Sequence, residues 1–348
     1  MTEVKCVAVV ANDLIQNGEP EMGRTSPLLA LSSLPDDFKV VSVGGDYSEL
    51  REKAEGGEEM LKKVSILFVC SGSGQILTEI LHKMTGIKWI QGLFAGLDHL
   101  RCEELILAEK EGRLTLTNAK GVFSSSLAEW VMFSCGYFCK DIPRLQENKS
   151  KKSWNRYTVG ELRGSSMGIV GYGSIGEATA KLAKAYGMKV IGVRRRPEMS
   201  KNDAYLDSIV GMDKLNEVMA ISDFLVLSAA LTPQTEGMIG VAQFASSKKG
   251  QVFINVGRGK LVDEDALLAA LGPNGPLLGA ACDVFATEPL PDSSPFWDVP
   301  NILISAHNAD ITPNFHHQSV EHFCKNCALY SKGGIDVLEN KVSAAEGY

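Results

Sequence analysis

Three polar residues that are far apart in the sequence stand where an open parallel sheet places its ligands. Arg258, Glu288 and His307 each follow a run of apolar residues typical of a buried strand. Because the carboxyl ends of parallel strands lie at one edge of a sheet, we expect the three side chains to converge on one crevice. A guanidinium group binds anions through paired hydrogen bonds, and an imidazole exchanges a proton near neutral pH. Taken singly, the same residues also fit a loop ion pair, a turn carboxylate and a core histidine.

A glycine-rich turn precedes these residues in the sequence. It lies between the apolar strand 167–170 and an amphipathic helix that we expect to end at Gly187. This strand–turn–helix context is typical of a dinucleotide-binding site, although a tight turn without a ligand is the alternative. The first glycine allows the tight turn, the second lets the backbone approach a pyrophosphate at the helix amino end, and the third lets helix and strand pack closely. The turn residues predicted to bind the cofactor are Gly171, Gly173, Ser174, Ile175 and Gly176.

An arginine cluster follows the next predicted strand. An NAD site usually presents an acidic residue here to the ribose hydroxyls, whereas this chain has Arg194, Arg195 and Arg196. Guanidinium groups suit the 2′-phosphate of NADP(H), with which they form charge-assisted hydrogen bonds. The sequence therefore predicts NADP(H) in preference to NAD(H), with a solvated basic turn as the alternative.

Short apolar runs alternate with helical patterns along the chain. Near-continuous apolar strands indicate burial on both faces, and the long connections imply parallel strands in right-handed βαβ units. The pattern restarts at Met167, and 348 residues exceed the usual length of a single core, so we expect two domains. Strands are expected at residues 6–11, 40–43, 66–70, 89–94 and 114–117, and then at 167–170, 189–193, 224–228, 252–256, 278–282 and 302–304. Helices are expected within 48–63, 75–85 and 126–139, and a polar surface arm at 149–161.

The composition disfavours several classes of protein. With 35 Lys and Arg against 42 Asp and Glu, the formal net charge is −7, which argues against a nucleic-acid or membrane-surface binder. The apolar stretch 121–139 contains Glu129 and three serines, so it predicts a buried helix rather than a membrane span. We expect a cytoplasmic protein, because no export signal is recognised and the 8 cysteines fall mostly in apolar runs. Cys324 and Cys327 form a C-x-x-C pair without a second pair, and no metal site is expected.

An ordered set of motifs makes the chain resemble the D-isomer-specific 2-hydroxyacid dehydrogenases, a family that includes glyoxylate and hydroxypyruvate reductases. The resemblance runs from about Gly92 to His307, and the order of the motifs is more specific than any one of them. The motifs are Gly92-Leu93-Phe94-Ala95-Gly96-Leu97-Asp98, Ala128-Glu129, the glycine turn, Leu231-Thr232-Pro233-Gln234-Thr235, the Arg258-Gly259 turn and Glu288-Pro289-Leu290-Pro291.

The resemblance implies an α/β fold of two doubly wound parallel-sheet domains, with a Rossmann nucleotide-binding domain inserted into a flavodoxin-like substrate domain. The substrate domain is expected to comprise residues 1–118 and 308–348, and the dinucleotide-binding domain residues 119–307. In relatives the nucleotide domain pairs as a dimer. A homodimer is therefore expected, with the helix 126–139 and the arm that carries Trp154 as suitable buried surface.

The implied activity is reduction of a small 2-oxo acid to the D-2-hydroxy acid by a reduced nicotinamide cofactor. At the matching positions, His307 is the general acid/base, Glu288 favours the protonated imidazole, and Arg258 binds the carboxylate and carbonyl oxygens of the substrate. Backbone N–H groups of a turn in the substrate domain are implied to meet the substrate carboxylate, and those residues are Ala95, Gly96 and Leu97. Asp283 is implied to face the nicotinamide carboxamide, and the other implied cofactor contacts are Ala230, Thr235 and Val256.

Two segments depart from the family pattern. Ser228-Ala229-Ala230 stands where relatives commonly carry a His-Leu-Pro type segment under the adenine. His307-Asn308-Ala309-Asp310 replaces a run of smaller residues, which puts Asn308 and Asp310 close to the expected catalytic histidine. The preferred acid depends on the packing of Phe94 and Trp297, two residues that are also typical of a core.

Other activities fit the same fold. Formate dehydrogenase is disfavoured because Glu288 stands where formate oxidation uses another polar partner, and phosphoglycerate dehydrogenase because no regulatory domain follows the short tail. A dehydrogenase-like binding protein of the corepressor type, which senses NADPH with little turnover, stays open because it can retain all three polar residues. Turnover of NADPH with glyoxylate or hydroxypyruvate separates the two classes.

Overall fold

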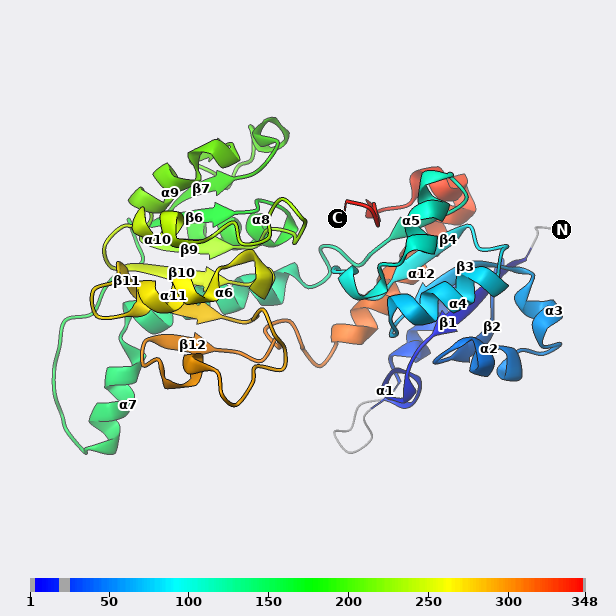
Figure 1. The fold of residues 1–348 in the computed structure, drawn as a ribbon, viewed down its shortest axis with the longest axis horizontal. Coiled ribbons are helices and arrows are strands. Elements are labelled where there is room, and N and C mark those ends of the chain that lie inside the picture. The colour runs from blue at the N-terminus through cyan, green and yellow to red at the C-terminus, as the bar shows by residue number, and fades with distance from the viewer. Residues whose placement is uncertain (1–3, 19–25, 347–348) are drawn as a thin grey trace. The chain divides into compact units, whose positions relative to one another are not determined.

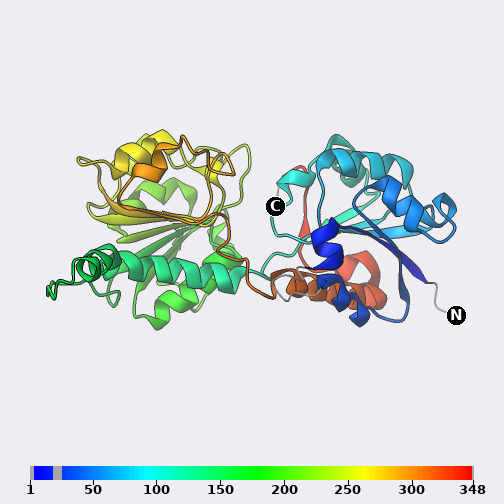
Figure 2. The same cartoon turned by 90° about the horizontal axis from the view of Figure 1, so that it is seen from below.

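The chain forms two compact units in the computed structural model, which describes residues 4–18 and 26–346. Unit 1 comprises Met1–Val122 and Ile311–Tyr348, and unit 2 comprises Phe123–Asp310. The expected domain crossings, at 118/119 and 307/308, lie within a few residues of these limits, while the expected outer limits 1 and 348 lie outside the described residues. In each unit, helices cover both faces of one sheet (Figures 1 and 2).

The sheet of unit 1 has the strand order β13-β5-β4-β3-β1-β2. Neighbouring strands are parallel except for β13, which pairs antiparallel with β5. Without β13, the order is the 2-1-3-4-5 order of flavodoxin-like folds, as the resemblance implied. The strands are β1 (Lys5–Val10), β2 (Phe38–Gly44), β3 (Val64–Val69), β4 (Trp89–Gly92), β5 (Thr115–Thr117) and β13 (Lys341–Val342).

Both faces of this sheet are buried. Successive residues of β1 point to opposite sides, so Ala8 and Val10 belong to one hydrophobic cluster and Val7 and Val9 to the other. Helix α12 covers the second face, whereas α4 and α5 cover the first (Figure 2). The helices of unit 1 are α1 (Asp13–Asn17), α2 (Tyr47–Lys53), α3 (Glu58–Leu61), α4 (Gly74–Lys83), α5 (Glu103–Lys110) and α12 (Phe315–Gly333), with short 3-10 turns at Pro27–Ser33, Asp98–Leu100 and Gly334–Val337.

The sheet of unit 2 is parallel and has the order β12-β11-β10-β9-β6-β7-β8. Counted within the unit, this is the 3-2-1-4-5-6 order of the Rossmann fold with a seventh strand added, so the predicted fold class is confirmed. The strands are β6 (Ser166–Val170), β7 (Lys189–Val193), β8 (Ser208–Val210), β9 (Phe224–Leu227), β10 (Gln251–Asn255), β11 (Leu277–Cys282) and β12 (Ile302–Ile304). The helices are α6 (Ser124–Cys139), α7 (Ile142–Ser150), α8 (Ser174–Ala185), α9 (Leu215–Ile221), α10 (Val241–Ala245) and α11 (Glu264–Leu271), with 3-10 turns at Pro197–Ser200, Met212–Lys214, Gly259–Leu261 and Pro295–Asp298.

Local chemistry accounts for the end of α8. Gly187 has a φ of 76°, and its N–H donates to Lys184 while the N–H of Met188 donates to Ala183. Glycine adopts this left-handed conformation without the steric cost that a Cβ brings, and the two hydrogen bonds satisfy carbonyls at the helix end. The helix therefore ends at the predicted glycine.

Some elements differ from the predicted ones. Strands β8 and β13 were not expected, since they have only three and two residues. The stretch 48–63 forms two short helices, because Gly56 and Gly57 between them have φ values of 90° and 57°. The expected polar arm begins inside α7, and its Trp154 is 96% exposed.

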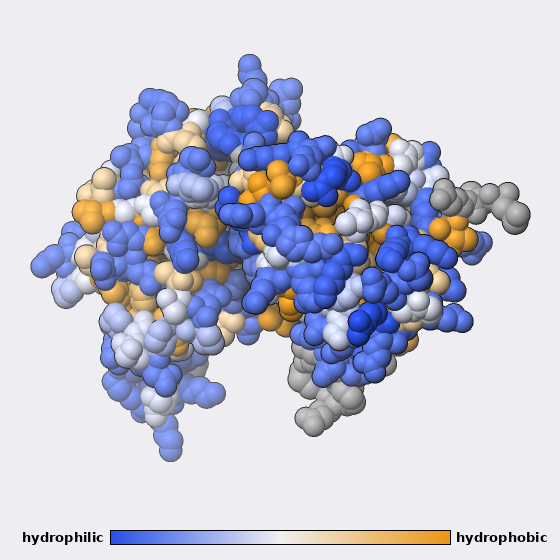
Figure 3. Space-filling view, turned by 45° about the vertical axis from the view of Figure 1, so that its right-hand side comes forward, coloured by the Kyte–Doolittle hydropathy of each residue, from blue (hydrophilic) through white to orange (hydrophobic). Residues whose placement is uncertain are grey.

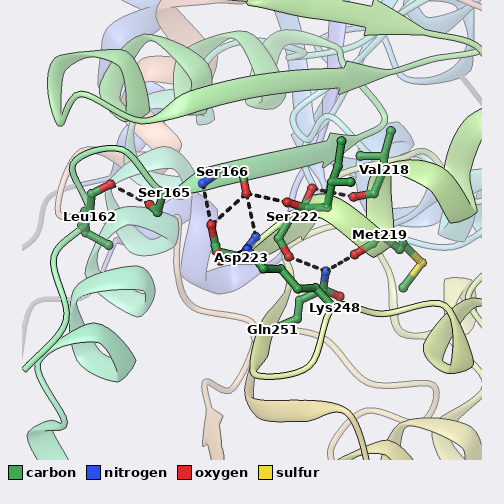
Figure 4. Close-up of polar contacts among 10 residues, drawn as sticks. Leu162, Ser165, Ser166, Val218, Met219, Ser222, Asp223, Lys248 and Gln251 are labelled. Atoms are coloured by element: carbon green, nitrogen blue, oxygen red, sulfur yellow. Dashed lines mark hydrogen bonds and ion pairs between the residues drawn. The ribbon is translucent and has the colours of Figure 1, made fainter.

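A polar network joins the amino ends of the central strands of unit 2 (Figure 4). The Asp223 carboxylate accepts hydrogen bonds from the Ser166 N–H and Oγ, both at 2.8 Å, and from the Lys248 ammonium at 2.5 Å. The Gln251 amide donates to the carbonyls of Met219 and Ser222. Burial raises the pKa of Asp223, but the hydrogen bonds from Lys248 and Ser166 outweigh it and hold this pKa below its ordinary value. The network fixes the sheet edge opposite to the glycine turn.

One face of the molecule is mostly hydrophilic (Figure 3). On the face shown in Figure 3, hydrophilic residues cover most of the surface and hydrophobic residues are scattered between them. Among the described residues, no helix has the length and apolar character to cross a membrane. All 8 cysteines are free thiols. Cys324 and Cys327 belong to α12 and are buried, and burial raises the pKa of Cys324 to about 11.

Asp223→Asn is expected to destabilise the protein by about 1–2 kcal/mol at pH 7. Hydrogen bonds to a charged group contribute about 1.5–3 kcal/mol, and partial exposure reduces this. Because the folded-state pKa of Asp223 is lowered, the difference is present above about pH 4 and is lost as the pH falls through that pKa. Urea unfolding followed by circular dichroism measures it, with the exposed Asp292→Asn as control. An equal loss in the control variant would contradict the expectation.

Candidate active site

The glycine turn joins β6 to α8 at the carboxyl edge of the unit 2 sheet. Gly171 has a φ of 89°, and a Cβ there would lie 2.4 Å from the backbone of Ala229. A Cβ on Gly176 would lie 3.1 Å from Ile169, whereas a Cβ on Gly173 would meet only the Gly171 carbonyl, at 4.0 Å. The first and third glycines therefore allow close packing, and the second leaves open space in front of the helix.

This open space fits the pyrophosphate of a dinucleotide. The first helical hydrogen bond of α8 runs from the Glu177 N–H to the Gly173 carbonyl. The N–H groups of Ser174, Ile175 and Gly176 precede that bond at the helix amino end, where the helix dipole favours an anion. No side chain caps this end.

The arginine cluster follows β7 at the same edge. Arg194 is half-buried and donates from Nη1 to the Ser200 hydroxyl at 2.5 Å and from Nη2 to the Met199 sulfur at 3.7 Å. Arg195 and Arg196 are exposed. Arg194 therefore orders the turn after β7, and its two neighbours present their side chains at the surface.

The segment after β9 forms a closed turn. The Thr235 hydroxyl donates to the Ala230 carbonyl at 2.7 Å and accepts from the Thr232 N–H at 2.8 Å. The Ser228 N–H donates to the Val170 carbonyl, directly before the glycine turn. Ala230 and Thr235 thus hold the turn in shape beside the open end of α8, and their contact with a cofactor stays a prediction.

His307 and Glu288 form a direct hydrogen bond. Nδ1 of His307 lies 2.7 Å from Oε2 of Glu288, and the two side chains are 43% and 36% exposed. The other carboxylate oxygen of Glu288 accepts from the Phe285 N–H at 2.8 Å. Both carboxylate oxygens of Glu288 are therefore hydrogen-bonded, and Nε2 of His307 points away from Glu288.

Asp283 fixes the backbone that carries His307. It is 1% exposed, and its carboxylate accepts from the N–H groups of Asn308 and Ala309, both at 3.1 Å. Its own carbonyl accepts from the His307 N–H at 2.8 Å. His307 has a φ of 53°, in the left-handed region that non-glycine residues rarely adopt. Asp283 therefore has a structural task that the sequence did not reveal, and its predicted contact with the nicotinamide stays a prediction.

Arg258 follows β10, in a turn that packs closely against the turn that contains Glu288. A Cβ on Gly259 would lie 1.8 Å from the carbonyl carbon of Phe285, so only glycine allows this approach. The Arg258 side chain is half-buried and donates to the Gly257 carbonyl, while Asn255 donates to the Arg258 carbonyl. Val256, the other predicted contact in this turn, donates its N–H to Leu227 and is buried.

The three predicted catalytic residues lie in one region of unit 2. His307 bonds Glu288, and the Arg258 turn packs on the Glu288 turn. Burial raises the pKa of Asp310, the neighbouring Asp283 carboxylate adds to this, and the charges of His307 and Arg258 act in the opposite direction.

Ala95, Gly96 and Leu97 belong to unit 1, in the turn after β4. The Asn118 amide donates to the Ala95 carbonyl at 2.6 Å. Leu97 packs against Gly92, where a Cβ would meet its side chain at 2.3 Å. Beside the turn, the Phe94 ring contacts three other rings, which belong to His99, Phe315 and His316. In unit 2, Trp297 is half-exposed and donates to the Pro291 carbonyl.

A cavity of about 420 Å³ opens at the carboxyl ends of β1 and β2 in unit 1. Its charged lining residues are Asp13, Asp46, Glu49 and Glu79. An acidic lining repels an anionic substrate, so the cavity does not suit a 2-oxo acid. No group of three or more His, Cys, Asp or Glu side chains among the described residues is arranged to hold a metal ion.

Gly171→Ala and Gly173→Ala are expected to separate folding from cofactor binding. The first change forces a Cβ into the Ala229 backbone at a positive φ, so it is expected to lower the melting temperature by several degrees. The second change has room in the fold, but it fills the space expected to receive the pyrophosphate. We expect an unchanged melting temperature and at least tenfold weaker NADPH binding by fluorescence titration. Unweakened binding in Gly173→Ala would contradict this assignment.

Known proteins resemble both the sequence and the fold. Residues 133–309 match the family model of the D-isomer specific 2-hydroxyacid dehydrogenase, NAD binding domain. A D-3-phosphoglycerate dehydrogenase from Methanocaldococcus jannaschii is 33% identical over 260 residues, which cover 73% of this chain and 48% of that protein. The chain thus spans about half the length of the phosphoglycerate dehydrogenases it matches.

Other relatives are matched along almost their whole length. A glyoxylate reductase from Thermofilum pendens is 29% identical over 332 residues, 91% of this chain and 93% of that protein. The crystal structure of an NADPH-dependent glyoxylate/hydroxypyruvate reductase from Sinorhizobium meliloti, in complex with NADP and sulfate, has 25% identity and a TM-score of 0.76, and the similarity covers 99% of this chain and 100% of that one. The family model, the relatives and the fold agree, and the chain belongs to the D-isomer-specific 2-hydroxyacid dehydrogenases.

Proposed function

We propose that the protein is an NADP(H)-preferring oxidoreductase that reduces a small 2-oxo acid, of the glyoxylate or hydroxypyruvate type, to the D-2-hydroxy acid. The observation that carries the proposal is the His307–Glu288 hydrogen bond of 2.7 Å, in the same region as Arg258 and at the carboxyl edge of a Rossmann sheet. This arrangement combines a proton donor with an anion-binding group beside a turn suited to a dinucleotide.

Each residue has a defined task in the proposed reaction. When bound, the reduced nicotinamide supplies a hydride to the carbonyl carbon. Glu288 occupies Nδ1 of His307, so Nε2 is the nitrogen that donates a proton to the carbonyl oxygen. Arg258 binds the substrate carboxylate and polarises the carbonyl. The imidazole is left neutral and, being 43% exposed, regains its proton from solvent.

The remaining contacts complete the proposed complexes. The N–H groups of Ala95, Gly96 and Leu97 are proposed to meet the substrate carboxylate. Val256 and Asp283 are proposed to contact the nicotinamide, and Ala230 and Thr235 the adenosine. We propose a homodimer that uses α6, on which Phe133 is exposed, and the arm with Trp154. The 8 free thiols suit the reducing cytoplasm.

The arginine cluster is proposed to select NADP(H). The structure of Sinorhizobium meliloti glyoxylate/hydroxypyruvate reductase contains NADP, which supports this choice. In the present chain, Arg194 also holds the turn through Ser200, and Arg194, Arg195 and Arg196 are the groups proposed to meet the 2′-phosphate.

Replacing the proposed catalytic residues is expected to abolish most of the turnover. His307→Ala and Arg258→Ala are each expected to lower kcat/KM for glyoxylate and hydroxypyruvate at least a hundredfold, because proton transfer and the carboxylate clamp are lost. Glu288→Gln keeps the shape of the side chain and is expected to lower kcat more than it raises KM. The exposed His317→Ala is the matched control. Near-wild-type turnover in either alanine variant would refute the mechanism, and NADPH binding without any turnover in the wild type would favour a sensor.

The cofactor preference is tested by the ratio of kcat/KM with NADPH to kcat/KM with NADH. We expect this ratio to exceed one in the wild type. Arg195→Ala and Arg196→Ala are each expected to lower it about tenfold through the KM for NADPH, with little change for NADH. Arg163→Ala, whose side chain is 80% exposed, is the control. A wild-type ratio that favours NADH would refute the proposed preference for NADP(H).

A further inference from the structure

Glu264 is a carboxylate outside the proposed catalytic group that bonds the turn carrying Glu288. Its Oε1 accepts the Ala286 N–H at 2.7 Å, across 22 positions of the sequence. The N–H of Phe285, one residue earlier, donates to Oε1 of Glu288 at 2.8 Å. Two neighbouring N–H groups of one turn therefore donate to two different carboxylates, and Glu288 is the one that contacts His307.

The peptide group between Phe285 and Ala286 is also held by Gly259. A Cβ on Gly259 would lie 1.8 Å from the carbonyl carbon of Phe285 and 2.2 Å from the nitrogen of Ala286, so the two backbones are in direct contact. The Glu264 carboxylate accepts the N–H of this same peptide group. Close packing and a hydrogen bond thus act on one peptide group, and together they restrict its rotation.

The start of α11 gives Glu264 a fixed position. Four residues of this helix are buried in the hydrophobic core of unit 2. The Asp263 side chain accepts the Ala266 N–H at 3.1 Å and caps the helix. Residues 287–289 of the turn, by contrast, are exposed, so packing against the core does little to hold them. The helix therefore supplies the turn with an anchor that its exposed residues lack.

We propose that Glu264 is a positioning residue for the proposed reaction, because it fixes the turn that aims the Glu288 carboxylate at Nδ1 of His307. The inference rests on the proposed function, since it takes this carboxylate and imidazole as the pair that delivers the proton. Segment 258–264 also begins with Arg258, so one short stretch of chain carries the proposed anion-binding group and holds the Glu288 turn. Loss of the Glu264 bond changes the relative positions of these groups, and catalysis is sensitive to displacements of about 1 Å.

Three variants of Glu264 separate the reach of its side chain from its charge. Glu264→Gln keeps the length and an acceptor oxygen, Glu264→Asp keeps the charge but is one methylene group shorter, and Glu264→Ala lacks the acceptor. With NADPH and glyoxylate, we expect the Ala and Asp variants to lower kcat about tenfold with less than about threefold change in KM. Glu264→Gln is expected to stay within about threefold of the wild type. Asp265→Ala, which removes the exposed carboxylate of the next residue in the same helical turn, is the matched control and keeps the wild-type kcat.

A double variant tests whether the loss of activity depends on Glu288. In the Glu288→Gln background, Glu264→Ala is expected to lower kcat by less than about twofold more, because the interaction that it positions is already altered. An equal loss in both backgrounds, or a Glu264→Gln variant as slow as Glu264→Ala, would contradict the proposal.

A measurement without turnover distinguishes this inference from the proposed function. In protein isotope-labelled at the nitrogens of its 6 histidines, the imidazole resonances of His307 are assigned by their absence in His307→Ala. We expect Glu264→Ala to shift them towards their positions in Glu288→Gln, and Glu264→Gln to leave them unchanged. If the wild type reduces no 2-oxo acid, the proposed function fails, and the resonances alone decide whether Glu264 positions Glu288. Unshifted resonances together with an unchanged kcat in Glu264→Ala would overturn the proposal.

Discussion

The hydrogen bond between His307 and Glu288 depends on backbone positions that neither residue sets by itself. Strand β12 pairs with β11, and this pairing continues past Ile304, where Ser305 donates to Cys282 and His307 to Asp283. His307 then adopts a φ of 53°, which costs on the order of 1 kcal/mol for a residue with a side chain. The two hydrogen bonds from Asn308 and Ala309 to the buried Asp283 offset this cost. Hydrogen bonds thus fix the backbone that carries the imidazole, as proton transfer from one defined nitrogen atom requires.

Close approach between backbones is the second constraint at this edge of the sheet. Gly171 lies against Ala229, and Gly259 lies against Phe285, in both cases at distances that a Cβ would not allow. Gly173 serves the opposite purpose, because nothing but a carbonyl oxygen lies within 4.0 Å of the position of its Cβ. Glycine therefore allows close backbone packing at Gly171 and Gly259, and it leaves space in front of α8 at Gly173. Without glycine at 171 and 259, these backbones could not approach so closely, and the position of the glycine turn relative to Arg258, Glu288 and His307 would change.

Much of the fold was predictable, because buried parallel strands are long apolar runs and the glycine turn has a strong local signal. The pairing of β13 with β5 was not, since two residues carry no periodicity and their place depends on the chain after α12 folding back. The break between α2 and α3 had a visible signal in Gly56 and Gly57. In the candidate site, residue type and strand position indicated the convergence of Arg258, Glu288 and His307, whereas their roles came from the family resemblance. The support that Asp283 gives to His307 has no sequence signal, because hydrogen bonds to main-chain N–H groups do not depend on the identity of the residues that carry them.

The structural task of Asp283 has an electrostatic consequence for the proposed substrate. A buried carboxylate is needed to hold the His307 segment, and it brings a negative charge into a region that is proposed to bind an anion. Glu288 adds another through its bond to the imidazole. In the proposed site, one guanidinium group and one imidazole then have to balance these two carboxyl groups as well as the substrate. In the proposed reaction, the charge of the substrate is therefore a property to which the site is sensitive, since a further negative charge enters a region with carboxyl groups that the fold requires.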